Sequence, residues 1–213
     1  MNRSFRQNPK GLTLIELLVV LVISTILVGG IYRLFVSQTR AYTVQDRVVE
    51  VQQNTRLAME LLLRDLRMTG FDNDRTPVPE IKNALTPKSD SITVIYEHNA
   101  LATQVNYWRD GSARLMRQET VNDVSRTETL LENVESLEFT YGVDGDEDGA
   151  MDDPKKNGIA DDWWEADEIG SQKVVAVRVS LTASPLQVNP DLQNVAPRTL
   201  VSAVTFRNRS LMR

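Results

Sequence analysis

The sequence predicts an α+β fold in which one long N-terminal α-helix, hydrophobic in its first half, packs on a C-terminal antiparallel β-sheet domain. Three observations predict it: an apolar segment at residues 12–32, helical spacing of apolar residues at 44–66, and six short strand-like runs after residue 90. A chain of 213 residues is long enough for one soluble domain with an appended helix, and short for two domains with separate cores.

The composition argues against several classes of protein. The chain has 24 Lys and Arg against 29 Asp and Glu, a mildly acidic balance that disfavours binding by phosphate neutralisation. We therefore expect no direct nucleic-acid partner. The absence of cysteine excludes disulfides, a thiolate nucleophile and cysteine-ligated metals.

Residues 12–32 form the first element, an apolar segment in which Glu16 is the only charged residue. A helix of this length rises about 31 Å, close to the thickness of one hydrocarbon core. The basic residues within 1–11 favour a cytoplasmic N-terminus and leave the rest of the chain outside. A secretory signal peptide or a plain signal anchor is the alternative, because residues 28–30 are small, as signal peptidase requires.

Glu16 is the feature that a signal peptide does not explain, because a carboxylate inside an apolar segment is costly in lipid and marks a functional site. The stretch Lys10-Gly11-Leu12-Thr13-Leu14-Ile15-Glu16 resembles the class III leader of type IV prepilins and pseudopilins. The resemblance implies that a prepilin peptidase cleaves between Gly11 and Leu12 and methylates the new amine of Leu12. The hydrophobic segment is then retained.

Assembly into a fibre would give Glu16 a role. Its carboxylate could meet the N-terminal ammonium of Leu12 in a neighbouring subunit, and this charge pair in an apolar core would fix the axial register.

A second helical pattern continues the first. Apolar residues recur every three or four positions from Val44 to Leu66, which is one face of an amphipathic helix. No proline occurs between Leu12 and residue 76, so we expect one helix from about Leu12 to Met68 that ends near Gly70. The chain then divides into a leader (1–11), a transmembrane or fibre-core helix half (12–37), an amphipathic helix half (38–70) and a soluble β-rich domain (71–213).

The soluble domain is predicted from β-branched and aromatic runs. The expected strands are residues 92–97, 104–109, 113–118, 136–141, 174–182 and 200–208. Asp110-Gly111 indicates a tight hairpin, and the proline-rich residues 76–90 indicate a connecting loop. We expect one antiparallel sheet wrapped on the second half of the helix.

Three further stretches resemble PilW-type minor pilins: residues 60–71 at the helix end, 131–141, and 206–209. The resemblance implies a pilin fold. Pseudopilin J of type II secretion is the related alternative.

Residues 144–168 form a strongly acidic loop, in which like charges repel unless a cation lies among them. The pattern D-x-D-x-D-G, as in calcium loops, begins at the first of these residues. The position where an EF-hand has its bidentate glutamate is Lys155, so a closing ligand must come from elsewhere. The candidate Ca²⁺ ligands are Asp144, Asp146, Asp148, the backbone carbonyl of Ala150, and Asp152.

A second acidic group follows within the same loop and supplies additional candidate ligands. These are Asn157, Asp161, Asp162 and Glu165. The alternative is a solvated acidic loop that binds no ion. The adjacent Trp163 and Trp164 are expected to point in opposite directions, because they lie in extended chain.

No catalytic residues are predicted. His98 is the only histidine, at an expected strand end, and the chain has no phosphate-binding glycine loop, HExxH motif or nucleophile elbow. The expected function is a minor pilin with a structural and assembly role in pilus initiation, at the tip or in decoration, serving motility or attachment. One alternative is a minor pseudopilin of type II secretion. The other is a signal-anchored calcium-binding surface domain that does not polymerise.

The resemblance also implies a location and partners. We expect a single-pass protein of the bacterial inner membrane with a periplasmic C-terminal domain, which later enters a cell-surface pilus. The expected partners are other major and minor pilins, the prepilin peptidase, the inner-membrane assembly platform and, before assembly, the membrane itself.

Overall fold

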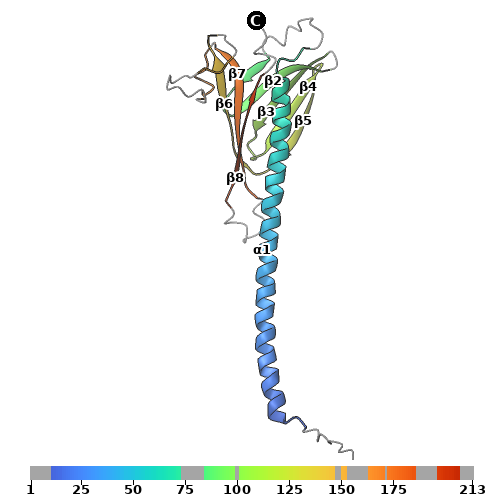
Figure 1. The fold of residues 1–213 in the computed structure, drawn as a ribbon. Coiled ribbons are helices and arrows are strands. Elements are labelled where there is room, and N and C mark those ends of the chain that lie inside the picture. The colour runs from blue at the N-terminus through green and yellow to red at the C-terminus, as the bar shows by residue number, and fades with distance from the viewer. Residues whose placement is uncertain are drawn as a thin grey trace, which may run out of the picture. The chain divides into compact units, whose positions relative to one another are not determined.

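The computed structural model describes residues 11–72, 84–98, 101–146, 150–152, 163–170, 172–185 and 196–206. The chain divides into two compact units, Met1–Asp46 and Arg47–Arg213. Helix α1 (Leu14–Met68) contributes to both units, and the β-strands belong to the second (Figure 1).

Helix α1 confirms the prediction of one long helix, and it runs through Gly29 and Gly30 without interruption. It ends where Gly70 adopts a φ of 72°, a left-handed conformation that suits glycine. The Gly70 N–H donates to the carbonyl of Ile95 at 2.9 Å, and the Glu97 N–H donates to the carbonyl of Phe71 at 2.8 Å. The helix end is therefore joined directly to a strand edge.

The strands form two antiparallel sheets, where the sequence led us to expect one. The five-stranded sheet has the order β1-β2-β3-β4-β5 and the three-stranded sheet the order β6-β7-β8. Their bounds are Leu85–Pro87 (β1), Ser91–His98 (β2), Leu101–Arg109 (β3), Leu115–Val121 (β4), Val124–Leu131 (β5), Val134–Asp144 (β6), Lys173–Ala183 (β7) and Arg198–Thr205 (β8).

Three local predictions were wrong. Strand β5 was not predicted, because its sequence is mostly polar and five of its eight residues are exposed. Strand β1 lies inside the expected loop. Strand β4 begins at Leu115 instead of residue 113, because the connection from β3 is longer than a two-residue hairpin: Asp110 accepts N–H bonds from Ser112 (2.9 Å) and Arg114 (2.8 Å).

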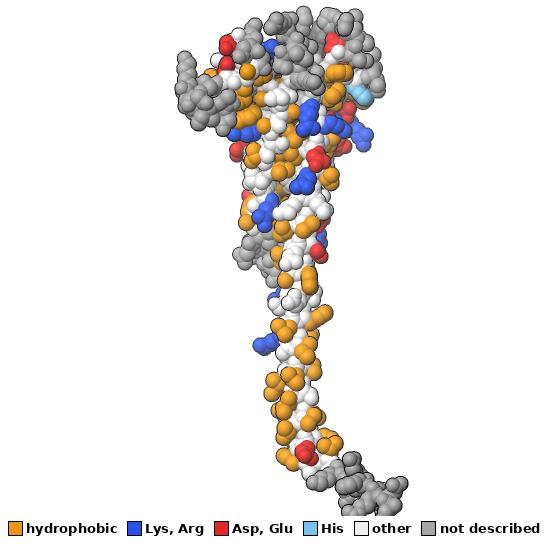
Figure 2. All heavy atoms as spheres, in the orientation of Figure 1, with side chains coloured by type: hydrophobic (Ala, Val, Ile, Leu, Met, Phe, Trp, Pro, Cys, Tyr) orange, Lys and Arg blue, Asp and Glu red, His pale blue; other side chains and the backbone are white. Residues whose placement is uncertain are grey.

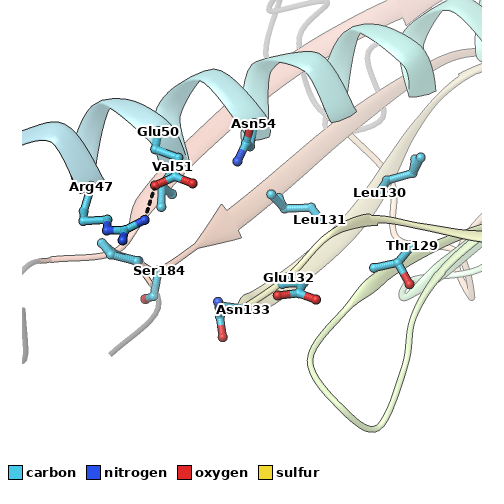
Figure 3. A pocket seen from close by; sticks show the side chains of 11 residues that line it. Arg47, Glu50, Val51, Asn54, Thr129, Leu130, Leu131, Glu132, Asn133 and Ser184 are labelled. Atoms are coloured by element: carbon cyan, nitrogen blue, oxygen red, sulfur yellow. Dashed lines mark hydrogen bonds and ion pairs between the residues drawn. The ribbon is translucent and has the colours of Figure 1, made fainter. Parts of the chain in front are cut away.

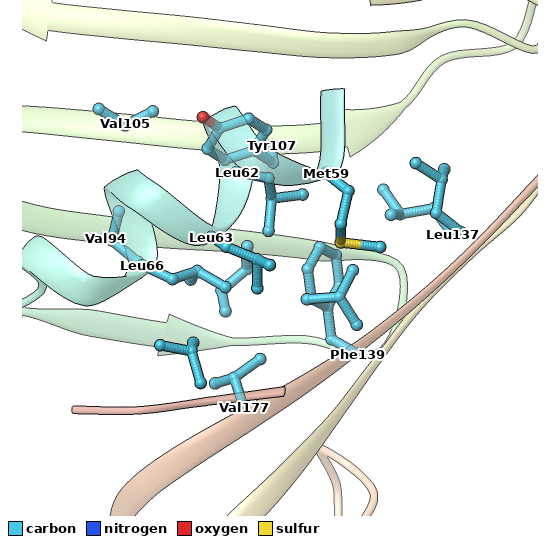
Figure 4. Packing of buried hydrophobic residues seen from close by; sticks show 14 of the residues in the cluster. Met59, Leu62, Leu63, Leu66, Val94, Val105, Tyr107, Leu137, Phe139 and Val177 are labelled. Atoms are coloured by element: carbon cyan, nitrogen blue, oxygen red, sulfur yellow. The ribbon is translucent and has the colours of Figure 1, made fainter. Parts of the chain in front are cut away.

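The core lies between the second half of α1 and the inner faces of both sheets. The helix contributes a stripe of fully or nearly buried side chains that includes Met59, Leu62 and Leu66. Figure 4 shows these side chains between Val105 and Tyr107 of the five-stranded sheet and residues of the three-stranded sheet. One helix therefore covers two sheets.

A buried polar group joins α1 to the five-stranded sheet. Asp65, on the core side of the helix, is 1% exposed. Its Oδ2 accepts a hydrogen bond from the Tyr107 hydroxyl at 2.6 Å and one from Arg117 Nε at 2.9 Å. Burial and the Asp65 carboxylate both raise the pKa of Tyr107, so its hydroxyl stays a donor.

The positive charge of the Arg117 guanidinium also faces two further carboxylates. Its Nη1 donates to Glu119 at 2.9 Å and to Glu128 at 3.2 Å, on β4 and β5. The buried cation thus contacts three carboxylates from three different elements, which offsets the cost of removing it from water.

The two sheets are also tied to each other. The Tyr141 hydroxyl of β6 donates to the Lys88 carbonyl at 2.6 Å and accepts the Lys88 N–H at 2.9 Å, next to the end of β1. Arg109 Nε of β3 donates to the carbonyl of Val134 at 2.7 Å. These bonds connect the two sheets where no strand ladder does.

Replacement of the buried carboxylate should destabilise the domain. Asp65→Asn removes the charge that faces Arg117, and we expect a loss of about 2–4 kcal/mol because a buried ion pair is broken without removal of its partner. The measurement is thermal or urea unfolding of the detergent-solubilised chain. Arg64→Ala is the control: Arg64 is 65% exposed and also bonds Asp65, so its loss should cost less than about 1 kcal/mol. Equal losses in both variants would contradict this account.

Candidate functional site

The N-terminal candidate site begins with a capping box. Thr13 precedes the first helical residue, and its N–H and hydroxyl both donate to Glu16 Oε2 at 2.8 Å. In return the Glu16 N–H donates to the Thr13 hydroxyl at 3.3 Å. Threonine and glutamate three residues apart thereby satisfy N–H groups that a helix start leaves unpaired.

Glu16 therefore has a local role that the sequence analysis missed. The motif T-x-x-E before an apolar run was the available signal. The negative charge also lies in the first turn, where it is favoured by the helix dipole. A second role for the carboxylate, in contact with another subunit, is compatible with the capping role because the site is exposed within this chain.

The two residues that flank the expected cleavage site are accessible within this chain. Leu12 is 82% exposed, and no atom lies within 4 Å of the position that a Cβ on Gly11 would occupy. Residues 1–10 of the expected leader lie outside the described residues.

The apolar half of α1 has no core of its own. Its large side chains from Leu12 to Phe35 are exposed, and Figure 2 shows hydrophobic side chains along this part of the helix. The Thr25 hydroxyl donates to the carbonyl of Leu21 at 2.8 Å, so this polar group is satisfied within the helix. Among the described residues, α1 is the one helix long and apolar enough to cross a membrane.

The acidic loop starts and returns at β6. The Asp152 N–H donates to the Val143 carbonyl at 2.8 Å, and the Asp152 carboxylate accepts the N–H of Gly145. Met151 lies over Gly142, so a side chain at Gly142 would collide with the Met151 sulfur. The described part of the loop is thereby closed at its base.

The structure describes some of the predicted calcium ligands. Asp144 is buried at 1% exposure, and Asp146, Ala150 and Asp152 are described beside it in the loop. Glu165 is also described, and its N–H donates to Glu168 at 3.0 Å. Within the described part of the chain no three acidic or histidine side chains are arranged to hold a metal. The remaining candidates, Asp148, Asn157, Asp161 and Asp162, lie outside the described residues.

The tryptophan pair shows the expected opposite orientations. Trp164 packs against the core and exchanges backbone hydrogen bonds of 2.8 and 2.9 Å with Tyr141 of β6. The ring of Trp163 lies 4.9 Å from the guanidinium carbon of Arg178 on β7, a cation–π contact. The chain between Asp152 and Trp164 is therefore anchored at both ends on the same sheet.

A groove of about 370 Å³ lies where the second unit's part of α1 passes the β5–β6 turn (Figure 3). One wall carries the ion pair of Arg47 and Glu50 at 2.7 Å, and Leu131 and Ser184 contribute to the other side. The described residues that line this groove include no histidine, and the Ser184 hydroxyl donates to the Glu135 carboxylate. His98, the last residue of β2, does not line it.

Comparisons with known proteins agree with this geometry. The family model described as type IV pilus-assembly protein W (PilW) matches residues 99–209, from the start of β3 to beyond β8. The prokaryotic N-terminal methylation motif matches residues 6–32, which contain Gly11, Leu12 and Glu16. No curated protein matches the chain. Because the first match covers more than half of the sequence and the second covers the leader, the chain belongs to the PilW family of type IV pilins.

Proposed function

We propose that this protein is a minor pilin with a structural and assembly role in a type IV pilus, in initiation, at the tip or in decoration. The observation that carries the proposal is the exposed apolar half of α1 behind a capped N-terminus and a methylation motif. Such a surface needs lipid before assembly and other subunits afterwards. Repeated head-to-tail contacts between subunits produce helical filaments. The role requires no catalysis by this chain.

The route to the filament follows from the same features. The chain is inserted in the inner membrane with its leader in the cytoplasm and its β domain in the periplasm. The prepilin peptidase removes residues 1–11, and the inner-membrane assembly platform delivers the subunit to other major and minor pilins. The family match to a pilus-assembly protein favours this route over a type II secretion pseudopilin.

We further propose that the acidic loop binds Ca²⁺ in the periplasm or outside the cell. The support is the concentration of carboxylates between Asp144 and Asp152 in a segment closed by the Gly145 to Asp152 hydrogen bond. Oxygen ligands of this type suit Ca²⁺, and millimolar affinity is sufficient in an extracellular setting.

The first prediction concerns processing. Protein recovered from sheared surface filaments should begin at Leu12 and carry one additional methyl group, as measured by N-terminal sequencing and intact mass. Recovery only from the membrane fraction with Met1 in place, or with a start after Gly30, would contradict the pilin function. Loss of exoprotein release without loss of filaments on deletion of the gene would instead indicate the secretion pseudopilin.

The second prediction separates the two roles of Glu16. If the carboxylate pairs with a neighbouring subunit, Glu16→Ala should reduce incorporation into filaments at least about tenfold, because one charge of a buried pair is lost. Thr13→Ala breaks the capping box and keeps the carboxylate, so this variant should still enter filaments. The measurement is the ratio of the protein in sheared filaments to that in the membrane. Equal loss in both variants would assign Glu16 to helix capping alone.

The third prediction concerns calcium. Addition of Ca²⁺ to tenfold above its Kd should stabilise the chain by about 1.4 kcal/mol, which raises Tm by a few degrees. Tryptophan fluorescence should follow the same titration, since Trp163 and Trp164 lie within the loop. Asp146→Asn should weaken the response, and Asp123→Asn in the β4–β5 turn is the control. A Tm that does not change with Ca²⁺ would rule out the site.

A further inference from the structure

The outer face of the five-stranded sheet is the side that points away from α1. Val105 and Tyr107 of β3 are buried on the helix side, so the alternate residues Gln104, Asn106 and Trp108 point outward. The register of the strands aligns the outward residues in three rows. The rows are Ser91-Trp108-Met116-Thr129, Thr86-Thr93-Asn106-Gln118-Thr127 and Ile95-Gln104-Thr120-Ser125.

None of the residues in these three rows carries a charge. The chain as a whole is 25% charged, so a solvated face of this size would ordinarily carry about three charged side chains. The inner side of the same strands does carry charges, in Arg117, Glu119 and Glu128. The neutrality therefore belongs to these three rows; Glu97, the next position of β2 on this face beyond Ile95, is buried.

Hydrogen bonds between neighbouring strands orient the polar groups of this face. The Thr93 hydroxyl donates to Asn106 Oδ1 at 3.1 Å, and Gln118 Nε2 donates to the Thr127 hydroxyl at 3.3 Å. Each amide keeps its other polar atom, Nδ2 of Asn106 and Oε1 of Gln118, without a side-chain partner among the described residues. Fixed donors and acceptors thus alternate across the sheet.

The outer face also contains a hollow and an aromatic ring. A hollow of about 290 Å³ lies beside the third row, lined by Ile95, Gln104, Thr120 and the β4–β5 turn, where Asp123 is the one charged residue of the lining. The half-buried Trp108 lies in the first row between Ser91 and Met116. A ligand that spans the rows would meet both apolar contact and amide groups.

We propose that the outer face binds an uncharged polysaccharide. Sugar hydroxyls can pair with the amides and hydroxyls of the rows, while the apolar C–H face of a sugar ring can stack on Trp108. An acidic polymer would find no cation in the three rows. A protein partner is less well matched, because protein interface cores are about 65% apolar, and here only Ile95, Trp108 and Met116 are apolar.

The proposal is tested on the purified full-length chain, so its outcome does not depend on filament assembly. The chain is solubilised in a zwitterionic detergent, because detergents with sugar headgroups would compete for the face. Binding is measured by affinity electrophoresis in gels that contain dextran or galactomannan, with the acidic polymer alginate as comparator. We expect retardation by at least one neutral polymer and none by alginate.

Matched variants assign the binding to the outer face. Trp108→Ala and Thr127→Lys should each weaken binding at least about tenfold. Thr199→Lys is the control, since Thr199 is an exposed threonine of β8 that bonds a cross-strand hydroxyl, as Thr127 bonds a cross-strand amide. Its affinity should equal that of the unchanged chain. The Tm of each variant is measured beside its affinity, and Thr127→Lys decides the outcome if Trp108→Ala does not fold.

Two results would overturn the proposal. The first is that the unchanged chain binds no neutral polymer, or that the Thr127→Lys variant binds it as tightly as the Thr199→Lys variant does. The second is that no polymer binds the unchanged chain and that a pilus protein copurifies with the unchanged chain but not with the Thr127→Lys variant. This result would make the outer face a protein interface.

Discussion

The buried stripe on the second half of α1 is the constraint on which the β domain depends. Leu62 and Leu66 are fully buried and contact residues of both sheets. Burial of a leucine contributes about 1.5–3 kcal/mol, so the buried positions of the helix add several kcal/mol to the stability of the core. Among the described elements, no second helix covers either sheet. The two sheets share this helix, and the hydrogen bonds of Tyr141 and Arg109 also join them directly.

Apolar packing alone would leave the position of the helix along the sheets weakly defined, since leucines one turn apart are nearly equivalent. The buried carboxylate of Asp65 removes that equivalence, because it bonds one hydroxyl on β3 and one guanidinium on β4. A shift by one turn would leave Arg117 without this partner. The polar group therefore selects one register, and the hydrophobic stripe supplies the stability.

The sequence was informative where a pattern is local. The helix, six strands and the leader each follow from periodicity or from residues at fixed offsets. Strand β5 could not be predicted because Ser125 to Thr127 are polar and exposed, and only pairing with β4 makes them a strand. The partition into two sheets and the contacts of Asp65 depend on residues far apart in the chain, which no local pattern encodes. The capping role of Glu16 follows from the T-x-x-E motif, but the cost of a carboxylate in an apolar segment favoured an intersubunit role alone.

The anchoring of the acidic segment on β6 has a consequence for engineering and for divergence. Its described residues Asp152 and Trp164 bond β6 at Val143 and Tyr141, so an insertion between them would join two points that lie close together on one strand. The entropic cost of lengthening such a closed loop grows only slowly with its length. An epitope or a fluorophore-binding peptide inserted there would leave the pairing of β6 with β7 intact. The segment is thus a position at which the protein could carry a label in living cells.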